Sequence, residues 1–428
     1  MHTRKHTSKH IGIIGAGIAG LHLGLRLQRL GIDCTIITDR TPEQVAAAQL
    51  ANIVAHWPTT LWRERILGVC HWPADEFGFN GLHYSIQTPK PIEIECRAAQ
   101  PARAVDYRIY LPQLMEDFVE RGGRLEVRPL DVKDICRIAE RFDLVVVAMP
   151  GNGFRDLFAR DDANSPYDRP QRYLLAGLYE GFRPAHARSG IISVKPGHGE
   201  ALTFPLLSRT GLVTGLAVIT HKPDDLPMLR ALSSSPDRAG YRAALLCTLE
   251  ELHPAIYDRI DTSRFGLQGP NDLAQAAVTP VVRRPYVDLG GGKYAVALGD
   301  AHVTVDPMMA QGANIGSYSA FVLADAIVEA DAFDLAFCHE VERNRSARIL
   351  GASRWVNAFL RPPDEVRMEL MVAMSRDRQL ADEYYDNFNR PEKQWERVGT
   401  PERIRNWLAE RELRAPYRVA ALAHAFAR

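Results

Sequence analysis

Three glycines near the start of the chain, Gly15, Gly17 and Gly20, have the G-x-G-x-x-G spacing that can bring backbone N–H groups to a phosphate. They follow a short apolar run at residues 11–14 and precede leucines that recur at helical intervals. In such a strand, turn and helix, one glycine turns the chain, one lets the backbone approach a pyrophosphate, and one lets the helix pack closely on the strand. The N–H groups at the helix start then face the negative charge. The spacing therefore predicts that Gly15, Ala16, Gly17 and Gly20 bind a dinucleotide.

A second strand is predicted at residues 33–37, where folds of this type usually end on an acid that holds the adenosine ribose. Thr38 has the expected register and Asp39 comes one residue later, so both are candidate ribose ligands. Arg40 is a candidate neighbour of the pyrophosphate or the adenosine. Arg108 lies at the head of a later predicted helix, where it is either a solvated surface charge or a phosphate ligand that reaches back to the cofactor.

A second element that can face an anion lies in the later part of the chain. A buried strand is predicted at residues 294–298, and a Gly-Asp pair, a proline-led turn and a new helix follow it. The carboxylate of Asp300 can accept a hydrogen bond from a ribityl hydroxyl, while the amides at the helix start can face the pyrimidine edge of a flavin. The predicted ligands of this element are Gly299, Asp300, Pro307, Gly312, Ala313 and Asn314.

Asn52 and His56 are polar residues in an otherwise apolar segment at residues 49–56. On the pattern alone, such side chains are either satisfied core groups or pocket groups. The six cysteines are scattered without a C-x-x-C pair, which favours free thiols in a reducing cytoplasm over a metal site or disulfides. We assign no metal ligands.

The composition limits the classes of partner. The 428 residues suggest two to three domains, and 46% apolar residues can bury substantial cores. Basic and acidic residues balance at 52 each, so no net field attracts nucleic acid or an anionic membrane. No uninterrupted apolar run is long enough to cross a bilayer. These features favour a cytoplasmic protein that acts on a small molecule.

The two glycine elements together resemble the flavoprotein monooxygenases of the glutathione reductase type. Within that group the chain is most similar to the oxygenase subunit of the two-component styrene monooxygenase family and to its relative, indole monooxygenase. The resemblance covers residues 9–415, and the stretches that carry it are residues 15–25, 103–108, 196–200, 304–307, 311–314 and 386–389.

This resemblance implies an α/β fold: an FAD-binding Rossmann fold of the glutathione reductase type, an antiparallel β-sheet substrate domain and an α-helical C-terminal region. A change of pattern to short strands and turns after residue 171 agrees with a separate substrate domain. The predicted divisions are 1–75, 103–170 and 291–333 for the FAD-binding domain, 76–102 and 171–290 for the substrate domain, and 334–428 for the C-terminal helices.

The resemblance also implies an activity. Reduced FAD and O2 would form a C4a-hydroperoxide that epoxidises a styrene-like aryl alkene or, as an alternative, the 2,3-bond of indole. Single-component relatives carry an Asp-Gly motif, tied to reduction by NAD(P)H, after the strand that here reads Val-Val-Val-Ala-Met-Pro at residues 145–150. Its absence implies a separate NADH-dependent flavin reductase that delivers reduced FAD. A homodimer is the oligomeric state considered.

Six positions bear on the substrate. Asn52, Val54 and His56 match the styrene-type members, whereas Phe79 replaces a Tyr, Leu82 a His and Ala102 a Ser, the last closer to the indole type. The predicted substrate pocket consists of Asn52, Ile53, Val54, Phe79, Leu82 and Ala102. The two catalytic candidates are Asn52, as a hydrogen-bond partner of the flavin edge or the peroxide, and His56, which would orient a neighbour or a water.

Two rival functions fit the same scaffold. A self-sufficient NAD(P)H-dependent aromatic hydroxylase would oxidise NADPH without a partner protein. A non-catalytic FAD-binding carrier would bind flavin and yield no oxygenated product. Neither explains an apolar pocket segment together with a missing reductase motif as well as a two-component oxygenase does.

Overall fold

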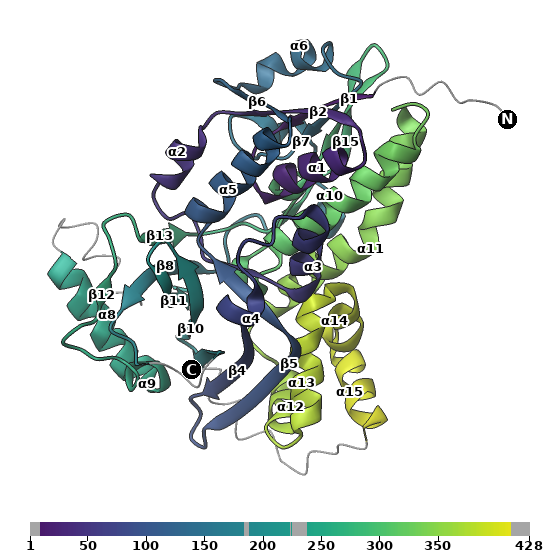
Figure 1. Ribbon diagram of the computed structural model, residues 1–428. Helices are drawn as coiled ribbons and strands as arrows, with labels where there is room; N and C mark the ends of the chain where they lie inside the picture. The colour runs from purple at the N-terminus through teal and green to yellow at the C-terminus, as the bar shows by residue number, and fades with distance from the viewer. Residues whose placement is uncertain (1–8, 184–187, 223, 225–237, 412–428) are drawn as a thin grey trace.

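The computed structural model describes residues 9–183, 188–222, 224 and 238–411. The described residues form two large sheets, a group of C-terminal helices and a two-stranded sheet of β14 (Val281–Val282) and β17 (Val303–Thr304) (Figure 1). The six-stranded sheet lies in the upper part of the view, and the larger sheet and the C-terminal helices lie below it.

The six-stranded sheet has the order β15-β16-β7-β1-β2-β6 and is parallel except at β15. Its central strands are runs of Ile and Val with almost no exposed surface, as expected for a parallel sheet covered on both faces. The sheet confirms the predicted nucleotide-binding unit. Its strands are β1 (His10–Ile14), β2 (Asp33–Thr38), β6 (Arg124–Val127), β7 (Leu144–Val147), β15 (Tyr286–Gly290) and β16 (Lys293–Ala297).

The helices around this sheet place the glycine motifs. Helix α1 (Ile18–Arg29) follows β1 directly and packs against α10 (Gly312–Glu329), so the two predicted anion-facing elements begin side by side. Helix α5 (Tyr107–Glu120) buries Leu114, Met115 and Phe118 against the same core. The smaller helices of this part are α2 (Pro42–Ala46), α3 (Pro58–Leu67), α4 (Ala74–Phe77) and α6 (Ile135–Ala139).

The larger sheet is mainly antiparallel, with the order β12-β8-β11-β10-β9-β4-β5-β3 and with β13 also paired to β8. The predicted hairpin at residues 195–199 joins β9 to β10, and the next turn joins β10 to β11. Helices α8 (Arg238–Leu252) and α9 (Pro254–Tyr257) pack on this sheet. Its strands are β3 (Val54–His56), β4 (Phe79–Ile86), β5 (Ile92–Val105), β8 (Tyr173–Glu180), β9 (Ser189–Lys195), β10 (Gly199–Ser208), β11 (Gly211–Thr220), β12 (Gly266–Leu267) and β13 (Leu273–Ala276).

The C-terminal region is helical, as predicted, within the part that is described. The apolar side chains of the helices from residue 355 onward share one core with β4 and β5 of the larger sheet, so these helices wall the substrate domain (Figure 1). Phe337, Cys338 and Val341, at the start of this region, pack in the core of the nucleotide-binding part instead. The helices of this region are α11 (Leu335–Phe359), α12 (Glu365–Met374), α13 (Arg378–Asp386), α14 (Pro391–Val398) and α15 (Pro401–Glu410). Residues 412–428 of the predicted region lie outside the described residues.

Three predicted domain boundaries are wrong. Strand β3 was expected in the nucleotide-binding part, but it pairs with β5 in the larger sheet. Strand β5 continues to Val105, past the predicted boundary at 102, and β15 joins the six-stranded sheet although 171–290 was predicted as substrate domain. Short strands carry no local signal for which sheet they join, because the partner is chosen by tertiary packing.

Among the described residues, no helix is both long enough and apolar enough to span a membrane. The six cysteines are free, as predicted.

Candidate flavin and substrate site

One cavity of about 770 Å³ is lined by both sheets and by the C-terminal helices. This volume lies in the range of natural ligand sites. One end carries the glycine motifs, and the other is lined by apolar side chains of β4, β9, β10 and the C-terminal region. We call them the nucleotide end and the apolar end.

At the nucleotide end the three glycines have different surroundings. Gly15 has a φ of +111°, which favours glycine, and it lines the cavity next to Ala16 and Gly17. A Cβ on Gly17 would meet no atom within 4 Å, so this residue leaves open space where a pyrophosphate fits. A Cβ on Gly20 would lie 2.0 Å from the carbonyl oxygen of Gly15, and Gly20 does not line the cavity. Gly20 therefore serves the close packing of α1 on the turn, one of the three roles predicted.

Thr38, Asp39 and Arg40 all line the nucleotide end, with Thr38 buried and the other two exposed. Arg108 does not line it. Its guanidinium donates to Asp106 at 2.6 Å and to Asp272 at 2.7 Å, and only 5% of its side chain is exposed. The alternative of a solvated charge is therefore wrong, and the cofactor role has no support because two carboxylates already hold the side chain.

The second element meets the first at the cavity wall. Gly299, with φ +58°, Asp300 and Pro307 line the cavity, as do Gly312 and Ala313 at the start of α10. The Asp300 side chain is open to the cavity, yet surrounding protein atoms raise its pKa by desolvation, against the opposing charge of Arg283. A hydroxyl donor from a ribityl chain would relieve this desolvation. The open space at Gly17 and the Asp300 carboxylate thus fit FAD.

Asn314 was predicted to face the flavin with its backbone amide, and its side chain points into the protein. The side-chain oxygen accepts from Trp57 N at 2.9 Å and Thr60 Oγ1 at 2.7 Å, while the nitrogen donates to the carbonyls of Ala55 and Ala310. With its bonds used in this way, the amide ties α10 to β3. The Asn314 side chain is therefore structural, and the predicted contact of its backbone N–H, in the first turn of α10, stays a prediction.

The apolar end contains most of the predicted substrate pocket. Ile53, Val54, Phe79 and Leu82 line the cavity, and Asn52 adds a polar side chain beside them. Among the residues that the structure describes, the charged ones that line the cavity are Asp39, Arg40 and Asp300, all at the nucleotide end. The apolar end can therefore exclude water and hold an aromatic ring.

Sequence reasoning missed several side chains of the apolar end. Phe204 of β10 stacks on Phe79 with ring centroids 6.0 Å apart. Tyr385 and Phe388, from the C-terminal region, also line the cavity, and their rings lie 5.6 Å apart. The stretch at 386–389 was a signal for this contribution, since it carried the resemblance without an assigned role.

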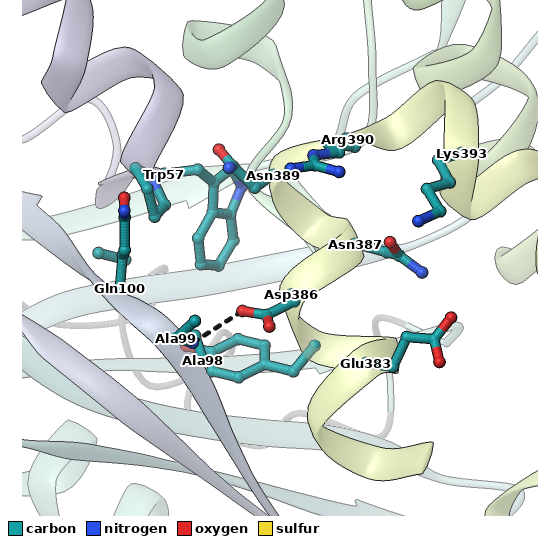
Figure 2. A pocket seen from close by; sticks show the side chains of 13 residues that line it. Trp57, Ala98, Ala99, Gln100, Glu383, Asp386, Asn387, Asn389, Arg390 and Lys393 are labelled. Atoms are coloured by element: carbon teal, nitrogen blue, oxygen red, sulfur yellow. Dashed lines mark hydrogen bonds between the residues drawn. The ribbon is translucent and has the colours of Figure 1, made fainter. Parts of the chain in front are cut away.

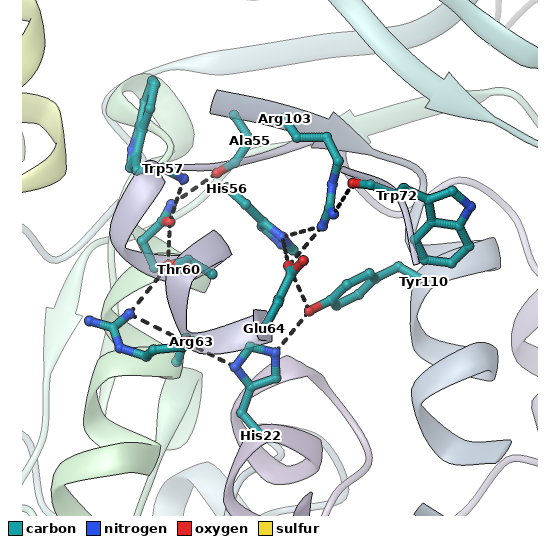
Figure 3. A network of polar contacts seen from close by, with 12 residues as sticks. His22, Ala55, His56, Trp57, Thr60, Arg63, Glu64, Trp72, Arg103 and Tyr110 are labelled. Atoms are coloured by element: carbon teal, nitrogen blue, oxygen red, sulfur yellow. Dashed lines mark hydrogen bonds and ion pairs between the residues drawn. The ribbon is translucent and has the colours of Figure 1, made fainter. Parts of the chain in front are cut away.

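His56 was predicted as a catalytic residue, but it does not line the cavity. It is completely buried, with Nδ1 2.7 Å from Glu64 Oε1 and Nε2 2.9 Å from the hydroxyl of Tyr107, which does line the cavity. Figure 3 shows His56 and Glu64 enclosed by Arg103 and Tyr110. Three buried polar partners surround the imidazole, so His56 has no direct contact with the cavity. The alternative of orienting a neighbour agrees with the Tyr107 contact.

Ala102 was predicted in the substrate pocket but lines a second, smaller pocket of about 320 Å³. Figure 2 shows β5 on one side of this pocket and the C-terminal helices on the other, joined where Asp386 accepts from the Ala99 amide at 2.9 Å. Trp57 and Tyr385 line both pockets and separate them. Ala102 is the direct cross-strand partner of Phe79, and the register of β4 against β5 becomes irregular just beyond this pair, between Phe79 and Gly81.

Residues 151–259 match a family model described as "Styrene monooxygenase A putative substrate binding domain". The chain is 38% identical to styrene monooxygenase StyA from Pseudomonas sp over 406 residues, which cover 94% of this chain and 98% of that protein. It is also 38% identical to StyA from Pseudomonas fluorescens over 403 residues, which cover 93% of this chain and 97% of that protein. The chain belongs to the styrene monooxygenase StyA family.

Solved structures agree on the fold. The flavin-dependent brominase Bmp2 has a TM-score of 0.64 at 17% identity, covering 94% of this chain and 99% of the brominase. The L111Y mutant of the halogenase PltM, solved in complex with FAD, has a TM-score of 0.60 at 14% identity. The match covers 94% of this chain and 86% of the halogenase. These likenesses confirm the FAD-binding fold of the glutathione reductase type.

Two of the stretches that carry the family resemblance meet in a buried ion cluster. Arg172 donates to Glu200 at 2.5 Å and to Asp306 at 2.6 Å, and only 4% of its side chain is exposed. Asp306 also accepts from the backbone amide of Met308 and so caps the turn that precedes α10. This cluster positions the turn of the second anion-facing element against the larger sheet.

Proposed function

We propose that this protein is the oxygenase component of a two-component flavin monooxygenase, which uses reduced FAD and O2 to epoxidise styrene-like aryl alkenes. The observation that carries the proposal is one continuous cavity with a glycine-lined nucleotide end and an uncharged apolar end. Membership of the styrene monooxygenase family supports the substrate class.

The bound flavin would supply the activated oxygen atom, and the protein residues supply binding and exclusion of water. Gly15, Ala16 and Gly17 would bind the pyrophosphate with backbone N–H groups. Thr38 or Asp39 would accept from the adenosine ribose, and Asp300 from a ribityl hydroxyl. The amides of Gly312 and Ala313, together with the dipole of α10, would stabilise negative charge on the reduced ring.

At the apolar end, Val54, Phe79 and Leu82 would hold the aromatic ring of the alkene. Such positioning can lower the activation free energy of the reaction by several kcal/mol. The same side chains keep water from the reacting atoms, which limits the loss of oxidising equivalents as H2O2. Asn52, which lines the cavity, would hydrogen-bond to the flavin edge or to the oxygen being transferred.

The reductant would come from a separate NADH-dependent flavin reductase. The stretch at residues 145–150 reads Val-Val-Val-Ala-Met-Pro and lacks the Asp-Gly motif of single-component relatives. Part of this stretch, at Ala148, Met149 and Pro150, lines the cavity with apolar and backbone surface. No carboxylate is available there for a second dinucleotide.

The experiment supplies chemically reduced FAD to the purified protein in air and compares styrene, indole and an aryl sulfide. We expect styrene oxide as the main product, with one enantiomer in excess by chiral chromatography. Indole oxidation at equal or greater efficiency would favour indole monooxygenase. Flavin binding without any oxygenated product would instead support the carrier.

A second assay tests the reductase requirement. The protein is mixed with NADH or NADPH and FAD under anaerobic conditions, without a partner protein. We expect the flavin absorbance to persist. Bleaching of the flavin would show that the chain reduces its own cofactor and would identify a self-sufficient hydroxylase.

A further inference from the structure

A buried chain of hydrogen bonds runs behind the cavity wall. His22 Nε2 lies 2.8 Å from the Tyr110 hydroxyl, which lies 3.0 Å from Glu64 Oε1. Glu64 Oε1 lies 2.7 Å from His56 Nδ1, and His56 Nε2 lies 2.9 Å from the Tyr107 hydroxyl. Figure 3 shows the first four of these residues between α1, α3, α5 and β3. The chain ends at Tyr107, which lines the cavity.

The central group of this chain is an ionised carboxylate. Burial alone would raise the pKa of Glu64, but the Arg103 charge and the His56 hydrogen bond lower it to about 2. Arg103 donates to Glu64 Oε1 at 2.7 Å, and both side chains are fully buried. An ionised carboxylate only accepts hydrogen bonds. Each neighbour of Glu64 must therefore donate to it.

This requirement fixes the tautomer of His56. Burial lowers the pKa of His56, so the imidazole is neutral and carries one N–H. At 2.7 Å from the carboxylate, Nδ1 must carry that proton, because a lone pair there would face a negative oxygen. Arg103 Nη2 is more distant from Nδ1, at 3.1 Å, and donates to the carboxylate instead. His56 Nε2 is then an acceptor, and the Tyr107 hydroxyl donates to it.

With its proton committed to His56, the Tyr107 oxygen has only lone pairs left for the cavity. Burial raises the pKa of Tyr107, which keeps the phenol protonated, and its ring stacks on Tyr110 with centroids 5.5 Å apart. The charge of Asp300 acts on Tyr107, and both residues line the cavity. Tyr107 and Asp300 therefore add two hydrogen-bond acceptors to the wall of one cavity.

We infer that Glu64 is a positioning residue, which fixes His56 as the Nδ1–H tautomer and thereby makes Tyr107 a hydrogen-bond acceptor for an O–H or N–H group of the bound flavin. This inference rests on the proposed function for the identity of the ligand, while the tautomer is a property of the protein alone. The hydrogen bonds of this chain all run in one sense. Tyr110 and His56 donate to Glu64, and His22 and Tyr107 donate to Tyr110 and His56 in turn.

The first test measures the tautomer in the flavin-free protein. Histidine is labelled with 15N, and the couplings between ring nitrogens and ring carbon-bound protons identify which nitrogen carries the proton. The His56 signal is assigned by its loss in His56→Gln or, if that variant does not fold, by its shift in Tyr107→Phe. We expect a neutral Nδ1–H tautomer. An Nε2–H tautomer or an imidazolium at neutral pH would overturn the inference.

The second test measures binding of oxidised and reduced FAD to Tyr107→Phe by fluorescence and by absorbance titration. Loss of one neutral hydrogen bond should weaken the affinity about fivefold. Tyr241→Phe is the matched control, because its buried hydroxyl bonds to Tyr179 in the larger sheet, away from the cavity. Equal affinities in wild type, Tyr107→Phe and the control would contradict the acceptor role.

The third test is Glu64→Gln, whose amide can donate as well as accept. The amide N–H can donate to His56 Nδ1, so we expect the Nε2–H tautomer and the same loss of FAD affinity as in Tyr107→Phe. Retention of the Nδ1–H tautomer would remove Glu64 as its determinant. Failure of the proposed oxygenation would leave these tautomer and affinity results unchanged, so the two hypotheses fail separately.

Discussion

The two ends of the cavity differ in what lines them: backbone groups at the nucleotide end and side chains at the apolar end. The nucleotide end is made largely of backbone at two short motifs, where Gly15 to Gly17 and the start of α10 each supply N–H groups. The apolar end is made of side chains brought from β4, β10 and the C-terminal region. A backbone-built site leaves little freedom at each glycine, whereas a side-chain-built site can change its ligand through single substitutions.

The largest effect that this comparison predicts is at Gly20. In Gly20→Ala the new methyl would lie 2.0 Å from the Gly15 carbonyl oxygen, so the helix or the turn must move. We expect a loss of about 3 kcal/mol in the free energy of unfolding, measured in urea, and loss of FAD binding. A stable variant with normal FAD affinity would show that the close approach of α1 to the turn is not required.

The same change at Gly17 should separate packing from binding. A methyl there meets nothing within 4 Å, so we expect the stability to stay within about 0.5 kcal/mol of wild type. The methyl would occupy the space of the pyrophosphate, and the FAD affinity should fall roughly tenfold. Unchanged affinity in Gly17→Ala would place the pyrophosphate elsewhere.

The polar layer behind the cavity makes the stability depend on pH. Burial lowers the pKa of His22 to about 3, from an ordinary value near 6.5. Because the unfolded chain takes up this proton near pH 6.5 and the folded chain does not, stability is full above that pH and falls toward pH 3. Between these two pH values, the free energy of unfolding falls by about 1.4 kcal/mol per pH unit because of this group.

Urea unfolding at a series of pH values measures this slope. In His22→Gln, the decline of stability below pH 6.5 should be shallower by the contribution of one group. His198→Gln, at an exposed hairpin position, is the control and should keep the wild-type slope. An unchanged slope in His22→Gln would mean that His22 is protonated in the folded protein.

Asn52→Ala tests whether a side chain beside the apolar end controls the yield of epoxide per reduced FAD more strongly than it controls FAD binding. Loss of one hydrogen bond to the flavin edge or the transferred oxygen should lower the epoxide formed per reduced FAD about threefold and raise H2O2 correspondingly. The FAD affinity should stay at the wild-type value if Asn52 contacts the transferred oxygen, and should fall by no more than about fivefold if Asn52 contacts the flavin edge. Product and H2O2 are quantified together in one reaction. Unaltered coupling would remove Asn52 from the site.

The difference between the two ends also explains what could be predicted from the sequence. The glycine spacing near Gly15 is a local pattern, because the physical constraint acts within one strand, turn and helix. Phe204 and Tyr385 carry no such pattern, since they reach the cavity only through pairing of β10 and packing of α13. The orientation of a side chain such as Asn314 is likewise set by tertiary partners, here Trp57 and Ala55.

The last comparison concerns Leu82 and Ala102, two of the three positions that depart from styrene-type members, which lie in different pockets. Leu82 lines the apolar end, whereas Ala102 lines the second pocket behind Trp57 and Tyr385. Leu82→His places a polar ring against the substrate, so the ratio of styrene to indole turnover should shift by a factor corresponding to about 1 kcal/mol or more.

Ala102→Ser should change this ratio by less than about twofold, equivalent to about 0.4 kcal/mol. The added hydroxyl would face the second pocket, where Gln100 and Asn387 are polar neighbours and the substrate is absent. Competition assays with both substrates in one reaction measure the ratio directly, without errors from enzyme concentration. A large shift in Ala102→Ser would mean that the substrate passes or occupies the second pocket, and the boundary formed by Trp57 and Tyr385 would then have to open during turnover.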